Sequence, residues 1–382
     1  MDLEVEKIVF GIFTIIKNDP ELETFDIILE PNQTNNSPLL YEQHNLGLQS
    51  WCIKKVYCYV HQKLFEKQTS GIENHIALLT TASMLNPNVK TYWNVRKELV
   101  LQGYLDLYSE LHYIEVILSS KPKVQDLFNH RKWLLKEIFK KQILRSDLFY
   151  NELKIVQKAA NNHVNNHMAW DFACWLLNFI ELNSEPVNIL KTYWNITETW
   201  ISTHVSDFSG MNFRQHLIKK FLDCTISMDI NFKRVVAFSC FKNLRHVFNV
   251  TDIPFDDKHI RLFFIIGLIL NDFEINENLI LFYANHEALW YNRRFLCYAM
   301  LQILPEKLSK DEDIDVFFNI IKECENTESK LDIEHPFYVL FLRIHELFLS
   351  HASRNNEELF LKRYKNWLKL KFLDYTANKY FN

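Results

Sequence analysis

The stretch Trp93-Asn94-Val95-Arg96 decides the fold, because its pattern of an aromatic residue, then Asn, then Arg recurs along the chain. Phe128-Asn129-His130-Arg131 repeats it in full, Trp170-Asp171-Phe172-Ala173 keeps the aromatic residue, and Met211-Asn212-Phe213-Arg214 keeps Asn and Arg. Trp290-Tyr291-Asn292-Arg293 ends the series. Successive anchors lie 35, 42, 41 and 79 residues apart, so we interpret the last interval as two units, one of them diverged beyond recognition. A period in this range is typical of an array of helical hairpins.

An amphipathic segment precedes each of the first three anchors. Its apolar residues recur at steps of three and four, which places them on one face of a helix. These residues are Ile72, Ile76 and Leu79; Leu111, Ile114 and Leu118; and Leu153, Val156 and Ala160. Turn-forming residues then lead to the anchor: Asn86-Pro87-Asn88, Lys121-Pro122-Lys123 or Asn161-Asn162-His163. With only 6 Gly and 9 Pro in 382 residues, a fold of many strands is disfavoured. The sequence predicts an all-α fold, a right-handed superhelical solenoid of helical hairpins similar to tetratricopeptide arrays.

Within the second helix of each unit, the aromatic residue and the Arg three positions later share one face. A guanidinium beside a buried ring is costly unless it is hydrogen-bonded. We therefore expect each Arg to reach carbonyls or a carboxylate of a neighbouring hairpin, with Glu110 and Glu152 as candidates. On this interpretation the repeated phrase is structural and touches no substrate. Its anchors are Trp93, Asn94, Arg96, Phe128, Asn129, Arg131, Trp170, Asn212, Arg214, Trp290 and Arg293.

The same phrase, on a second helix behind a Pro or Asn turn, resembles the repeat of protein prenyltransferase alpha subunits. The segments that match best are Leu85–Leu99, Leu111–Leu135, Asn165–Leu177 and His286–Phe295. The resemblance covers roughly residues 70 to 300, with boundaries good to a few residues. The long N-terminal lead and the phrase His-Glu-Ala-Leu-Trp-Tyr-Asn-Arg-Arg-Phe look most like the divergent branch called protein prenyltransferase alpha subunit repeat-containing protein.

The resemblance also implies where the chemistry lies. In these transferases the zinc, the lipid pocket and the thiol substrate belong to a separate beta subunit, which the alpha subunit wraps. The alpha subunit of the farnesyl and type-one enzymes supplies a basic residue in a Lys-Asn-Tyr-His-Ala-Trp phrase, which helps to stabilise the departing diphosphate. Aligning that Ala-Trp with Ala169-Trp170 puts Asn165 at the Lys and His167 at the Tyr. Asn165 and His167 are therefore the candidate diphosphate-facing residues, although Asn cannot supply the cation.

The sequence leaves two functions open, one as an enzyme subunit and one as a binding scaffold. The resemblance implies a non-catalytic alpha-type subunit of a protein geranylgeranyltransferase, inactive alone. Its partner would be a catalytic beta subunit of the Rab geranylgeranyltransferase type, which holds the prenyl diphosphate and modifies C-terminal cysteines of protein substrates. The alternative is a helical-repeat binding scaffold without transferase activity. Intervals of 35, 42 and 41 residues and the recurrent Asn-x-Arg favour the first reading over tetratricopeptide arrays, whose period is about 34.

Composition excludes several classes of protein. A formal charge of −4 gives no preference for nucleic acid. Seven cysteines without a Cys-x-x-Cys pair, and 15 His in no spaced cluster, indicate neither a disulfide framework nor a metal site, so we expect no cofactor in this chain and zinc only in the partner. The longest apolar runs, Ile8–Ile16 and Leu262–Leu270, are shorter than the ~20 residues of a transmembrane helix. Acidic residues stand where a signal peptide is basic, so we expect a cytoplasmic protein.

We expect three regions. Residues 1–67 form an N-terminal helical lead with a polar loop at Pro31–Pro38, residues 68–303 form the prenyltransferase alpha-type repeats, and residues 304–382 form C-terminal capping helices. The basic amphipathic end, Leu361–Phe372, suits either a lipid or partner contact or a terminal cap, and a cap is favoured because solenoids need one. A partner surface is expected along the turn-proximal starts of the second helices, near Asn165, His167, Asp207 and His286.

Overall fold

The computed structural model describes residues 2–29, 37–66, 71–141, 145–183, 185–223, 229–251, 253, 257–283, 285–308, 313–325, 336–352 and 358–372. Most of them lie in helices, so the all-α prediction is confirmed. The chain divides into two compact units, Met1–Ser184 and Glu185–Asn382, and each is described by itself. Among the described residues, no helix combines the length and the apolarity that crossing a membrane requires.

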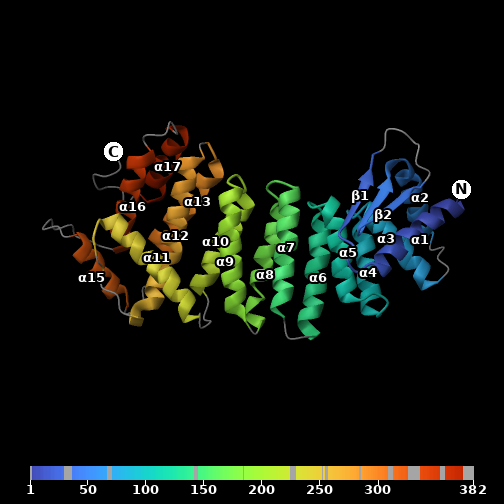
Figure 1. Ribbon diagram of the computed structural model, residues 1–382, viewed down its shortest axis with the longest axis horizontal. Coiled ribbons are helices and arrows are strands. Elements are labelled where there is room, and N and C mark those ends of the chain that lie inside the picture. The colour runs from blue at the N-terminus through green and yellow to red at the C-terminus, as the bar shows by residue number, and fades with distance from the viewer. Residues whose placement is uncertain are drawn as a thin grey trace. The chain divides into compact units, whose positions relative to one another are not determined.

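Three helical hairpins make up most of the first unit, as the repeats predict. Figure 1 shows their helices side by side, and first helices pack on first helices while second helices pack on second helices. Each second helix starts three residues before its anchor, and the apolar faces of both layers meet in a common core. The hairpins are α3 (Ile72–Leu85) with α4 (Lys90–Leu101), α5 (Leu107–Ser120) with α6 (Gln125–Lys141), and α7 (Ser146–Asn162) with α8 (His167–Leu177), followed by the short helix η1 (Ile180–Leu182).

The N-terminal lead is not purely helical, and this part of the prediction is wrong. Between α1 (Asp2–Asn18) and α2 (Ser50–Phe65) lies a three-stranded sheet of order β1-β3-β2, with β1 parallel and β2 antiparallel to β3. The strands are β1 (Thr24–Ile28), β2 (Leu39–Glu42) and β3 (Asn45–Gln49). The sheet packs on α5, where the Phe25 amide donates to Ser119 Oγ at 3.1 Å. Residues 30–36, most of the expected polar loop, lie outside the described part of the chain, as does the boundary at residue 67.

Two further hairpins make up the first part of the second unit. The hairpins are α9 (Pro186–Thr203) with α10 (Phe208–Asp223), and α12 (Ile260–Phe282) with α13 (Glu287–Tyr298), and between them come α11 (Ile230–Phe248) and η2 (Asp257–His259). Helix α10 packs directly on α12 and α13, while α11 packs along α12. Among the described residues of the 79-residue interval, α11 and the short helix η2 are inserted in place of a diverged hairpin, so that interpretation is wrong.

Helices after the last hairpin close the second unit. They are the π-helical turn η3 (Ala299–Ile303), α14 (Leu304–Leu308), α15 (Asp313–Glu325), α16 (Pro336–Ala352) and α17 (Glu358–Lys371). Tyr364 and Leu368 of α17 are buried, and Tyr364 packs on Trp290 with ring centroids 5.7 Å apart. Lys362, Arg363 and Lys365 are exposed. Helix α17 thus has the buried inner face and polar outer face expected of a cap.

Candidate functional site

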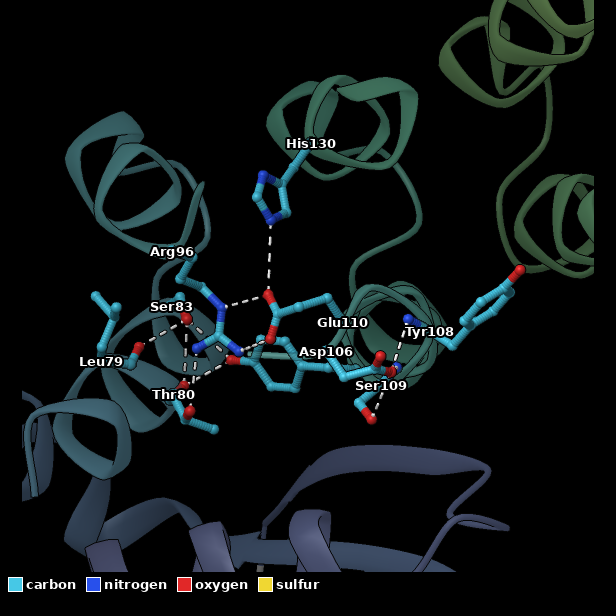
Figure 2. Close-up of polar contacts among 10 residues, drawn as sticks. Leu79, Thr80, Ser83, Arg96, Asp106, Tyr108, Ser109, Glu110 and His130 are labelled. Carbon is cyan, nitrogen blue, oxygen red and sulfur yellow. Dashed lines mark hydrogen bonds and ion pairs between the residues drawn. The ribbon is translucent and has the colours of Figure 1, made fainter. Parts of the chain in front are cut away.

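The first repeat arginine joins two hairpins. Figure 2 shows the Arg96 guanidinium of α4 between Glu110 of α5 and Thr80 of α3. Its Nε donates to Glu110 Oε2 at 2.9 Å and its Nη2 to Glu110 Oε1, while Nη1 donates to Thr80 Oγ1 at 3.0 Å. Arg96 and Glu110 are each 2% exposed. One side chain therefore ties the first helix of its own hairpin to the first helix of the next.

The same arrangement recurs at the next two repeat arginines. Arg131 donates through Nε and Nη2 to Glu152 and through Nη1 to the Leu111 carbonyl at 2.7 Å. Arg214 donates from Nη2 to Asp272 at 2.7 Å and from Nη1 to the Trp194 carbonyl at 2.8 Å. The predicted partners Glu110 and Glu152 are confirmed. Asp272 was not predicted because α11 separates it from Arg214 along the chain, and it is one of three acidic residues in α12, beside Glu274 and Glu277.

The pattern changes at the end of each unit. In α8 the arginine is replaced by Ala173, and α8 is the last helix of the first unit. In the second unit Arg293 has no following hairpin, and its Nη1 donates to Glu277 Oε1 of its own first helix at 2.6 Å. The Arg293 guanidinium carbon lies 3.6 Å from the ring centroid of Phe348 in α16. A capping helix thus supplies the contact that the next hairpin supplies elsewhere.

The aromatic anchors are buried, but most of the motif asparagines are not. Trp93, Phe128, Trp170 and Trp290 are at most 3% exposed, and Trp93 Nε1 donates to the Pro87 carbonyl at 2.7 Å. In contrast, the motif asparagines of the first, second and fourth hairpins are exposed: Asn94, Asn129 and Asn212. Their assignment as packing anchors is therefore wrong, since an exposed amide contributes nothing to the core.

Electrostatics around Glu110 differ from those of an ordinary carboxyl. Burial alone would raise its pKa, but the Arg96 guanidinium and the neighbouring His130 hold the pKa of Glu110 below its usual range. His130 Nε2 lies 3.6 Å from Glu110 Oε2, which is longer than a hydrogen bond. Burial lowers the pKa of His130, which favours the neutral imidazole. Since the pKa of Glu110 is lowered and that of Arg96 is raised, the two side chains form an ion pair at neutral pH.

The two candidate diphosphate-facing residues lie in the turn before α8. Asn165 has a left-handed backbone with φ of 54°, and His167 is exposed at the first position of the helix. Asn166 between them is buried, accepts from the Ala169 amide at 3.3 Å and donates to the Pro122 carbonyl at 2.7 Å. This turn therefore sits beside the turn before α6. Sequence reasoning missed Asn166, which is a helix cap and not a ligand-binding residue.

Asn285 offers a structural reason for the asparagine at 165. It lies five residues before Trp290, as Asn165 lies five before Trp170, and it also has a positive φ, 67°. Asparagine tolerates this conformation far better than most other residues. The backbone of the turn thus favours Asn at this position independently of any ligand.

The corresponding turns of the second unit also meet. Ser206, just before α10, lies 2.6 Å from His286, just before α13, measured from Oγ to Nδ1. Asp207 is 5% exposed, accepts from the Trp200 indole at 2.9 Å and caps α10 through the Gly210 amide at 3.2 Å. Asp207 is therefore not available to a partner, and its place in the expected partner surface is wrong. No group of three or more His, Cys, Asp or Glu within the described residues could hold a metal ion.

Comparison with known proteins bears directly on this architecture. Residues 107–138 match the model of the protein prenyltransferase alpha subunit repeat. The resemblance to the protein prenyltransferase alpha subunit family is confirmed. The matched segment runs from the start of α5 into α6, so it contains one complete prenyltransferase alpha-type repeat with its Glu110 and its Arg131.

The most informative relatives fall into two groups. Protein prenyltransferase alpha subunit repeat-containing protein 1 of Homo sapiens is 27% identical over 95% of this chain and 96% of its own length. The protein of the same name from Danio rerio is 28% identical over 79% of this chain and 74% of its own length. Geranylgeranyl transferase type-2 subunit alpha of Candida albicans is 28% identical, over 47% of this chain and 53% of its own length. The similarity to the repeat-containing proteins thus extends beyond the prenyltransferase alpha-type repeats.

Proposed function

We propose that this chain is the non-catalytic alpha-type subunit of a protein geranylgeranyltransferase and pairs with a separate catalytic beta subunit of the type-2 (Rab) kind. The observation that carries the proposal is the similarity to type-2 alpha subunits together with the prenyltransferase alpha-type repeat at residues 107–138. In this proposal the beta subunit supplies zinc and holds the prenyl diphosphate, and the substrates are cytoplasmic proteins with C-terminal cysteines.

The contacts of the repeat arginines favour a structural rather than a catalytic role for this chain. Arg96, Arg131 and Arg214 are buried and fully engaged in joining hairpins. The turn-proximal starts of the second helices include the exposed His167 and the half-buried Asn165. We propose that this edge faces the beta subunit.

Co-expression tests the pairing. The untagged chain is expressed with each of three tagged beta subunits, of the type-2, type-one and farnesyl kinds, and the purified material is weighed by mass spectrometry. We expect a one-to-one complex with the type-2 beta subunit that transfers geranylgeranyl from its diphosphate to a protein ending in cysteine. Failure to co-purify with any of the three beta subunits contradicts the proposal.

A binding scaffold without transferase activity is the second candidate, and Asn165 is the observation that favours it. A lysine stands at the equivalent position of the farnesyl-type phrase, whereas here the turn is built for asparagine. The two candidates separate in one measurement: a complex that forms with the type-2 beta subunit but transfers no lipid supports the scaffold.

A further inference from the structure

A small open pocket lies between the second helices α4 and α6 of the first unit, with a volume of about 240 Å³. We call it the Lys97 pocket. Its walls are formed by two lysines, two motif asparagines, one acid and two rings: Lys90, Lys97, Asn94, Asn129, Asp126, Trp93 and His130. Two of the lining residues, Asn94 and Asn129, are the exposed asparagines of the repeated phrase, which do not take part in core packing.

The positive charge in the Lys97 pocket is not neutralised by an ion pair. Across the described ranges, neither Lys90 nor Lys97 pairs with a carboxylate. The next hairpin provides the comparison, because Lys132 occupies in α6 the position of Lys97 in α4 and pairs with Asp171 at 2.8 Å. The residue equivalent to Asp171 in α6 is Asn129, so Lys97 lacks that partner. Asp126 is the one acidic residue among the pocket's lining residues.

His130 lines the same pocket and is 1% exposed. Its ring lies between Trp93 and Trp133, with centroids 5.1 and 5.7 Å away, and neither ring nitrogen has a hydrogen-bond partner in the described part of the chain. Figure 2 shows one nitrogen directed at Glu110 and the other directed away from it. Buried polar groups without a partner are rare in folded proteins and costly, so an unpaired nitrogen here indicates a missing partner.

We propose that the Lys97 pocket binds a phosphate group. The two lysines supply positive charge, and the Asn94 and Asn129 amides supply directional donors. A bound phosphate group favours protonation of His130, which then donates to the ligand through the ring nitrogen directed away from Glu110. Pockets for drug-sized ligands measure about 300–1,000 Å³, so this smaller pocket suits a single phosphate group rather than a prenyl diphosphate. The proposal is independent of any beta subunit.

Calorimetric titration of the full chain with inorganic phosphate tests the proposal, at constant ionic strength set with chloride. We expect one saturable site. Lys97→Gln should weaken binding by about tenfold, the value of one charge-assisted hydrogen bond, while the matched Lys132→Gln should change it little. Asn129→Asp should abolish binding, because it gives Lys97 the carboxylate that Lys132 already has. All three changes are on partly or fully exposed side chains, and circular dichroism checks that each variant is folded.

Sulfate separates the protein's titration from that of the ligand, since it remains a dianion between pH 5.5 and about 8. Burial lowers the pKa of His130 in the free protein, and a bound anion opposes that effect, so sulfate should bind more tightly at the lower pH, where its binding is accompanied by proton uptake at His130. The charged groups around His130 are Glu110, Arg96, Lys97, Lys90 and Asp126. Lys97→Gln should preserve the pH dependence of sulfate binding while lowering the affinity.

A comparison of O-phosphoserine with inorganic phosphate identifies the source of the phosphate group. Tighter binding of O-phosphoserine would assign the pocket to a phosphorylated side chain, and tighter binding of inorganic phosphate to the free ion. Equal phosphate affinity in the parent, Lys97→Gln and Asn129→Asp overturns the proposal.

Discussion

At the scale of single residues, the repeat arginines hold neighbouring hairpins together through buried ion pairs. Arg131 is 2% exposed and bonds both Glu152 and the Leu111 carbonyl. Arg131→Ala should lower the free energy of unfolding by about 2–4 kcal/mol, because it leaves the Glu152 carboxylate and a carbonyl buried without a donor. Urea denaturation measures the change. The matched control is Lys132→Ala, whose pair with the 72% exposed Asp171 should contribute less than about 1 kcal/mol. If Arg131→Ala and Lys132→Ala lowered the free energy of unfolding equally, the buried ion pair would contribute no more to stability than the exposed one.

The ionisation of Glu110 makes the stability of the first unit depend on pH in the acid range. Burial alone would raise its pKa, but Arg96 holds the pKa in the folded state below the ordinary value of 4.5. The carboxylate therefore contributes its full stabilisation above that value and loses it as the pH falls through the lower, folded-state pKa. Glu110→Gln should cost more stability at pH 7 than at pH 3.5, as measured by urea denaturation at both values. A cost that does not shrink in acid contradicts the assignment.

At the scale of elements, the helices were predictable and the strands were not. Hydrophobic periodicity places the three hairpins of the first unit because each helix has one apolar face. The sheet was missed because its signal is short and its turn is unusual. Gln43 and His44 form a two-residue connection with φ of 48° and 63°, a conformation that normally selects Asn-Gly. Asp272 was missed for another reason: no local pattern reveals an inserted helix such as α11.

Helices α11 and α12 approach each other closely at one glycine. A Cβ at Gly267 would lie 2.6 Å from the Val236 carbonyl oxygen, and backbone cannot yield as a flexible side chain can. Gly267→Ala should therefore destabilise the second unit by about 1–3 kcal/mol despite the higher helix propensity of alanine. The control is Asn278→Ala, at an exposed position of the same helix, which should change stability by less than about 0.5 kcal/mol. Thermal unfolding of both variants decides the matter, and an unchanged midpoint for Gly267→Ala is the contrary result.

At the scale of the whole molecule, the repeat arginines explain how the hairpins are joined. Because these side chains are buried, a function must depend on residues at the surface. In the first unit, the spacing of the repeat arginines predicts which hairpins are joined, through Glu110 and Glu152, whereas the inserted helix α11 hides the joint between Arg214 and Asp272. The candidate site could be read only in part. Asn165 lies in the turn before α8 and His167 is the first residue of that helix, and their place opposite a diphosphate stays a prediction. The burial of Asp207 depends on the Trp200 indole, which the spacing of the phrase does not predict.

Zinc content tests the proposal that the metal belongs to the beta subunit and not to this chain. We predict that the purified, untagged chain binds no stoichiometric zinc and transfers no prenyl group by itself, because its sequence has no spaced set of Cys, His or Asp ligands. Metal analysis by mass spectrometry and a prenylation assay with the chain alone measure both. The complex with the beta subunit serves as the positive control, and zinc at one equivalent in the isolated chain is the contrary result.

The last prediction concerns the turn before α8 and rests on the proposed function. If this turn faces the diphosphate, Asn165→Lys restores a cation and should raise the transfer rate where diphosphate departure is limiting, since a well-placed charge stabilises the leaving group. The left-handed backbone at Asn165 should cost the lysine variant about 1–2 kcal/mol of stability, and Asn165→Gly controls for the backbone alone. Joint replacement of Asn165 and His167 by Glu should depress turnover by about tenfold or more through charge repulsion, without loss of assembly.

The Asn165→Lys variant and the double Glu variant are both measured in the reconstituted complex, with co-purification as the check on assembly. Parent-like rates in both would mean that the turn does not face the reaction, and the scaffold function would then be the better account.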